Sequence, residues 1–102
     1  MRDALREAVL AVGGGLGSVI FHNDKAWSAD TFSGTRHTLR IEFDGPEEVE
    51  GGEKLVDELA SHEFSIPGQL VADAGVEHVE HRMLGNPRMV VTASLLLMEV
   101  GR

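Results

Sequence analysis

Two histidines and a glutamate, in the segment His78-Val-Glu-His81, are among the residues most suited to metal chemistry in this chain. Imidazole and carboxylate groups are common protein ligands for zinc and related ions. On a β-strand, positions 78 and 81 point to opposite faces, so their imidazoles do not readily share one ion. His78 and Glu80 share a face, and His37 could supply a further ligand. The alternative is that these are solvated strand residues.

Two other patterns invite a catalytic or phosphate-binding interpretation, and neither is supported by its surroundings. A phosphate-binding loop needs the order strand, glycines, helix, whereas Gly13-Gly-Gly-Leu-Gly17 follows a predicted helix and precedes a strand. We therefore interpret the glycines as a helix end and a turn. No serine lies in a Gly-x-Ser-x-Gly elbow. A Ser-His-Asp site assembled across the fold stays open, but no spacing indicates one.

Composition limits the class of protein. The chain has 102 residues, which predicts one domain spanning 1–102. Its content of 42% hydrophobic and 25% charged residues is ordinary for a folded domain. It contains no cysteine, which excludes disulfides, thiol catalysis and cysteine-ligated zinc. We expect residues 2–12 to form an amphipathic helix rather than a signal peptide.

Acidic residues are concentrated in one segment. Residues 42–63 contain nine acids and one lysine, and so carry a charge equal to the whole net charge of −8. The sequence has no cluster of basic residues that could bind a phosphate backbone, which argues against ordinary nucleic-acid binding. The acidic cluster could be a cation site, a solvated helix face, or a wall that repels a passing polyanion. Its members are Glu47, Glu48, Glu50, Glu53, Asp57 and Glu58.

Helices and strands follow one another in the predicted secondary structure that would position these candidate residues. After the first helix we predict a short strand over 18–21 and a polar loop over 22–34, in which Trp27 and Phe32 are core anchors or contact residues. Apolar and polar residues alternate over 36–43, which predicts a half-buried strand.

A second helix then begins near Asp44, which has the capping-box spacing to Glu47. Its glycine pair, Gly51-Gly52, predicts close packing or a kink.

The last part of the chain predicts a β-hairpin. Residues 70–84 read as an irregular strand with a bulge at Gly75, and Gly85-Asn-Pro87 as a turn. Residues 89–100 are apolar on both faces, which places them centrally in a sheet or at a subunit interface.

The sequence therefore predicts an α+β fold: a mostly antiparallel sheet of three to four strands, two helices packed on one face, and a C-terminal β-hairpin. The other face would lack a cover within the chain, which predicts a partner.

The segment from Trp27 onward resembles the small tail-completion proteins of long-tailed phages, prophages and gene transfer agents, that is, the tail terminator or head–tail joining family. The resemblance lies in a Trp27-Ser28 loop, a strand opened by Gly34 and His37, and a helix with spaced small and apolar residues. A short entry to the next strand and a closing hairpin follow. The positions in that helix and strand entry are Val49, Gly52, Leu55, Val56, Leu59, Ile66, Gly68, Leu70 and Val71.

The resemblance covers roughly residues 4–100 and implies a structural protein that is not an enzyme and has no cofactor. Members form a homo-oligomeric ring, commonly a hexamer, that caps the tail tube, joins it to the head connector and surrounds the DNA path. That implies a location in the virion, and in the host cytoplasm during assembly, with no membrane. On exposure and charge we place the subunit interface near Trp27, Phe32, Arg36, Met83, Leu84 and Met89, and the lumen near Glu47, Glu48, Glu50 and Glu53.

Two alternatives from other classes stay open. One is a small metal-binding domain or enzyme that uses His37, His78, Glu80 and His81. The other is an adaptor module that adds its sheet edge to a cellular partner.

Overall fold

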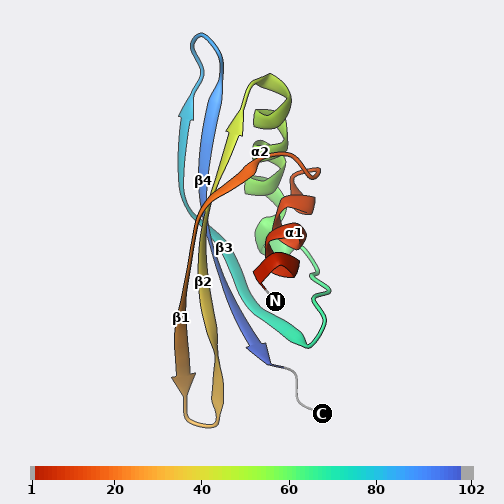
Figure 1. Ribbon diagram of the computed structural model, residues 1–102, viewed down its shortest axis with the longest axis vertical. Coiled ribbons are helices and arrows are strands. Elements are labelled where there is room, and N and C mark those ends of the chain that lie inside the picture. The colour runs from red at the N-terminus through yellow and green to blue at the C-terminus, as the bar shows by residue number, and fades with distance from the viewer. Residues whose placement is uncertain (1, 100–102) are drawn as a thin grey trace.

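The computed structural model describes residues 2–99 and shows an α+β fold, as predicted (Figure 1). The elements follow the order α1 (Arg2–Val12), β1 (Ser18–Ala29), β2 (Phe32–Asp44), α2 (Pro46–Glu58), the 3-10 turn η1 (Leu59–Ser61), β3 (Gln69–Arg82) and β4 (Arg88–Glu99). Val100, the predicted end of the last strand, lies outside the described residues.

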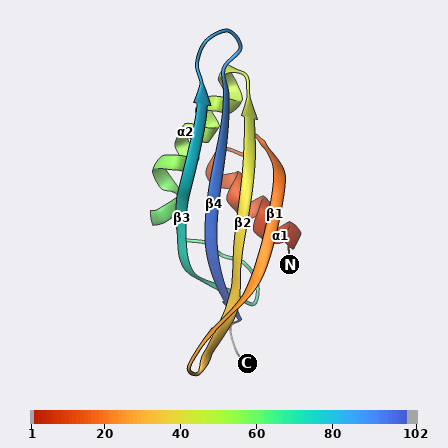
Figure 2. The same cartoon turned by 90° about the vertical axis from the view of Figure 1, so that its left-hand side faces the viewer.

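The four strands form one antiparallel sheet in the order β1-β2-β4-β3. β4 is therefore an inner strand, the first of the two placements that its apolar sequence predicted, and β3 and β4 form the C-terminal hairpin. Both helices lie on one face of the sheet, and Figure 2 shows the opposite face without a cover. This arrangement confirms the predicted layers.

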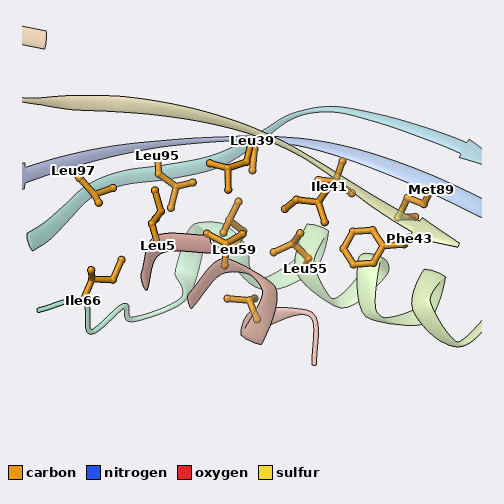
Figure 3. Packing of buried hydrophobic residues seen from close by; sticks show 14 of the residues in the cluster. Leu5, Leu39, Ile41, Phe43, Leu55, Leu59, Ile66, Met89, Leu95 and Leu97 are labelled. Atoms are coloured by element: carbon orange, nitrogen blue, oxygen red, sulfur yellow. The ribbon is translucent and has the colours of Figure 1, made fainter. Parts of the chain in front are cut away.

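The core lies between the helices and the inner strands (Figure 3). Alternate residues of β2 and β4 point toward the helices because side chains alternate along a strand. Leu39, Ile41 and Phe43 are fully buried from β2, and Leu5 and Leu55 meet them from α1 and α2. The predicted apolar stripes of strand and helix thus pack against each other.

The uncovered face is more polar than the sequence led us to expect. Two cross-strand charge pairs lie on it: Arg88 Nε is 2.7 Å from Glu42 Oε2, and Arg40 Nη2 is 3.6 Å from Glu80 Oε1. Val90 and Leu96 of β4, which lie on this face, are only 2% and 7% exposed. Because no helix covers this face, neighbouring side chains of the sheet must cover them. Phe21 of β1 and Leu70 of β3 lie on the same face and are 48% and 55% exposed, so the face combines charge pairs with separate exposed apolar groups.

The predicted loop over 22–34 is wrong, because these residues form a long hairpin. β1 continues to Ala29, and β2 starts at Phe32. Strand pairing continues from His22 opposite Leu39 to Ala29 opposite Phe32. The segment lacks apolar alternation because the helices do not cover its outer part, and its strands are held there by the backbone ladder.

Two local predictions also need correction. The irregular pairing in β3 lies between Val71 and Asp73 and between Val76 and His78, not at Gly75. α2 has Gly45 as its N-cap, without a side-chain cap. A Glu48 carboxylate oxygen, rather than Glu47, accepts a 2.9 Å hydrogen bond from the Asp44 backbone N–H.

The hairpins extend beyond the helices at both ends of the molecule. The structure measures 50 × 21 × 20 Å, with the β1–β2 turn at one end of the long axis and the β3–β4 turn at the other (Figure 1). Within residues 2–99, no helix is long and apolar enough to cross a membrane.

Gly51 and Gly52 allow close packing, which decides between the two predictions made for this pair. A Cβ atom on Gly52 would lie 2.7 Å from Met89 Sδ and 2.8 Å from the Phe43 ring. One on Gly51 would overlap the Gly13 carbonyl oxygen, at the end of α1. The α2 backbone therefore lies directly against both the sheet and the turn after α1.

We expect Gly51→Ala to lower the free energy of unfolding by about 1–2 kcal/mol. Overpacking against backbone costs roughly 1–3 kcal/mol, and the better helix propensity of alanine offsets part of that cost. Urea denaturation would measure the change. Gly75→Ala is the matched control, because no atom lies within 4 Å of its Cβ position. Equal stability of the two variants would contradict the close-packing interpretation.

Candidate functional site

His22, Asp24 and His37 gather where the first hairpin meets α1. His22 and Asp24 are two residues apart on β1 and so share a face, and Asp24 lies directly opposite His37 on β2. The same register places these side chains on the helix side of the sheet, where His37 is only 3% exposed. The three side chains each offer a ligand atom within 4.8 Å of the others.

A chain of hydrogen bonds fixes the protons on both imidazoles. Arg6 of α1 donates from Nε to His22 Nδ1 at 3.0 Å. Because arginine only donates, neutral His22 must carry its proton on Nε2. That nitrogen lies 2.9 Å from His37 Nδ1, which therefore accepts the next hydrogen bond. Both rings are consistently arranged as neutral imidazoles.

Burial and neighbouring positive charge disfavour protonation of this pair. Burial, and then the charges of Arg2, His37 and Arg6, lower the pKa of His22 to about 4, although Asp24 acts in the opposite direction. Burial also lowers the pKa of His37, which Asp24 partly opposes. The site is thus electrostatically suited to uncharged histidines.

Arg2 anchors the first turn of α1 to β1. It forms an ion pair with Asp24 and donates a 3.0 Å hydrogen bond to the backbone carbonyl of His22. Together with Arg6, it fixes the position of α1 over the hairpin. Two arginines thus satisfy the polar groups of the cluster from the helix side.

A groove opens beside the cluster, beyond the first residues of α1. It has a volume of about 590 Å³. Asp24 and His37 line it together with a mixture of polar and apolar residues. The other lining residues are Arg2, Ala26, Trp27, Ser28, Ser33, Gly34, Thr35, Gln69, Leu97 and Glu99.

The structure does not bring together the predicted metal ligands His37, His78, Glu80 and His81. His78 and Glu80 are exposed on the uncovered face of β3, opposite Thr92 and Val90 of β4. His81 pairs with Met89 and so lies on the other face. β4 separates all of them from His37. Of these four predicted ligands, only His37 belongs to the cluster found within residues 2–99 that could hold a metal ion.

His22 and Asp24 were missed because their segment was interpreted as a loop. The pattern His22-x-Asp24 gains meaning only on a strand, where it puts an imidazole and a carboxylate on one face. One signal could have found them. Residues 22–29 are about as long as the predicted strand that follows and are joined to it by a short turn, which is the arrangement of a β-hairpin.

The predicted contact residues fall into three groups. Phe32, Met83 and Leu84 are 61%, 75% and 87% exposed near the hairpin turns. Trp27 is half-buried on β1, and Arg36 donates a 2.9 Å hydrogen bond to Ser94 on the uncovered face.

Met89 does not belong with these contact residues. It is 3% exposed and packs in the core. The prediction placed it at a surface because the direction of its side chain depends on strand register, which the sequence does not reveal.

The four predicted acids lie along α2. Glu47, Glu50 and Glu53 are exposed, and Glu48 is partly buried through its contact with the start of the helix. They face away from the sheet, because the residues of α2 that are buried are Val49, Gly51, Gly52 and Leu55. A negative surface therefore covers the outer side of α2.

Comparisons with known proteins found no relative of this chain. No protein-family model matches the chain, and no characterised protein or solved structure is significantly similar to it.

We expect the metal-free protein to lose stability as the pH falls from about 7 to about 5. The ordinary histidine pKa of 6.5 applies to the unfolded chain, whereas the folded pKa of His22 is about 4. Between these values the unfolded state binds more protons, so acid favours unfolding. The stability that neutral His22 contributes is fully present above its pKa in the unfolded chain. It is lost as the pH falls through the pKa of His22 in the folded protein, about 4.

Thermal unfolding in the presence of a chelator would measure this dependence. His22→Gln should show a smaller decrease in Tm over the same pH interval, while His78→Gln, on the exposed part of β3, should behave like the wild type. An identical decrease in all three proteins would show that His22 does not control the effect.

Proposed function

We propose that this chain is a non-enzymatic structural subunit that assembles into a homo-oligomeric ring of the tail terminator or head–tail joining kind. The observation that carries the proposal is the exposure of large apolar side chains at the two opposite ends of an elongated subunit. The sequence resemblance and the form of the α+β domain add support.

The two ends of the subunit present different apolar surfaces. Phe32 lies beside the β1–β2 turn, while Met83 and Leu84 lie in the β3–β4 turn at the other end (Figure 1). Exposed large apolar groups favour contact with a partner when they gather at a site. Contacts between unlike surfaces of one molecule generate rings when the rotation closes. The elongated shape is suited to such head-to-tail contacts.

The sheet also has two unlike edges. β1, with 12 residues, forms one edge, and β3, with 14, forms the other. Long edge strands expose backbone groups that can pair with another strand. The register irregularities of β3 divide its edge into shorter segments, so pairing would use only part of it. The edges supply a second means of joining one copy to the next.

The acidic outer side of α2 fits a DNA path. If the helix layer faces the interior of the ring, Glu47, Glu50 and Glu53 project toward the lumen. Negative charge there would repel the DNA backbone and let it move without binding. In this proposal the tail tube protein and the head connector contact the two rims of the ring, in the virion and, during assembly, in the host cytoplasm.

The same edge strands favour a second candidate, an adaptor that pairs its sheet with a cellular protein. Genes for a portal, a major tail protein and a tape measure beside this one would support the structural role. Their absence, together with a stable complex with a cellular protein, would support the adaptor.

We expect the double substitution Met83→Asp and Leu84→Asp to dissociate the oligomer without unfolding the subunit. Both side chains are largely exposed, and charge at an apolar contact is costly to desolvate. Size-exclusion chromatography with light scattering would measure the mass, and circular dichroism would verify the fold. Ser65→Asp, at an exposed position outside both turns, is the control and should keep the wild-type mass.

The wild-type mass tests the proposal itself. A monomer throughout the micromolar to millimolar range that also fails to bind purified tail tubes would refute the ring. A wild-type oligomer that survives the double substitution unchanged would refute the contact at the β3–β4 turn.

A further inference from the structure

We propose that His22, Asp24 and His37 bind one first-row divalent metal ion, with Zn²⁺ as the best fit. The site goes beyond the proposed structural role and does not depend on it. Its basis is the position of two imidazoles and a carboxylate on one face of a hairpin, with a groove beside them.

The backbone already holds the three ligands in a suitable arrangement. Two come from alternate positions of β1 and the third from the paired position on β2, so the strand ladder sets their spacing. The donor set of two nitrogens and one oxygen suits zinc, which commonly takes three protein ligands and one exchangeable ligand. Asp24 and His37 both line the groove, which gives water access to the remaining position.

The distances require small movements. His22 Nε2 and His37 Nδ1 are 2.9 Å apart. Two nitrogens on a tetrahedral zinc ion, each about 2.0–2.1 Å from the metal, are separated by roughly 3.3 Å. The rings must therefore move apart slightly, and Asp24, whose side chain is 42% exposed, can rotate toward them.

Binding requires a change in the hydrogen bonds of His22. The metal would take Nε2, which moves the ring proton to Nδ1 and ends the hydrogen bond donated by Arg6. It would also compete with Arg2 for Asp24. The two arginines therefore hold the metal-free site together and weaken metal binding. Replacing Arg6 by a residue that accepts a hydrogen bond from Nδ1 should strengthen it, because such partners orient metal-bound histidines.

Titration of the full-length, metal-free protein with Zn²⁺ by isothermal calorimetry tests the site, with Co²⁺ absorption as a readout of coordination by nitrogen and oxygen. We expect one ion per chain. His22→Ala and Asp24→Asn should each weaken binding at least tenfold, and Arg6→Gln should tighten it about tenfold. Asp24→Asn preserves shape at an exposed position, so the test does not depend on a core substitution.

His78→Ala is the matched control, since His78 lies on the exposed part of β3 away from the cluster. It should bind zinc like the wild type. Failure of the wild type to bind one zinc ion at micromolar concentrations would overturn the proposal. So would affinity that is unchanged in both His22→Ala and Asp24→Asn, or lost in His78→Ala. Circular dichroism of each variant separates a lost ligand from a lost fold.

Discussion

The close approach of α2 to the sheet is the constraint on which the rest of the structure depends. Gly51 and Gly52 allow the helix backbone to lie against the turn after α1 and against Phe43 and Met89. This contact fixes the height of the helix layer above the sheet. Its contact with the turn after α1 helps to set where α1 lies over β1, and from α1 Arg2 and Arg6 donate hydrogen bonds to His22.

The buried core and the exposed hairpins occupy different parts of the long axis. The apolar core lies between the helices and the middle of the sheet, while both hairpins continue beyond the helices (Figure 1). The uncovered face carries cross-strand charge pairs as well as the buried side chains of Val90 and Leu96. Exposed ion pairs contribute little stability each. They make the sheet surface more polar, and the three most exposed large apolar side chains, Phe32, Met83 and Leu84, lie near the turns.

The sequence predicted those elements whose burial produces a periodic pattern. α1, the inner part of β2, α2 and the central position of β4 all follow from apolar residues spaced by helix or strand geometry. Residues 22–26 of the first hairpin gave no such signal, because His22, Asp24 and Ala26 face α1 or the groove instead of an apolar core. Of the observed cluster only His37 was a predicted ligand. The order β1-β2-β4-β3 explains the wrong grouping, since it inserts β4 between His37 and the histidines of β3.

The extension of the hairpins beyond the helix layer has a mechanical consequence. Segments with few buried contacts open locally at lower free energy than the core. The β1–β2 turn can therefore bend and twist while the middle of the molecule remains rigid. In the proposed ring, copies joined through such turns would take up deformation at the joints and not in the subunits.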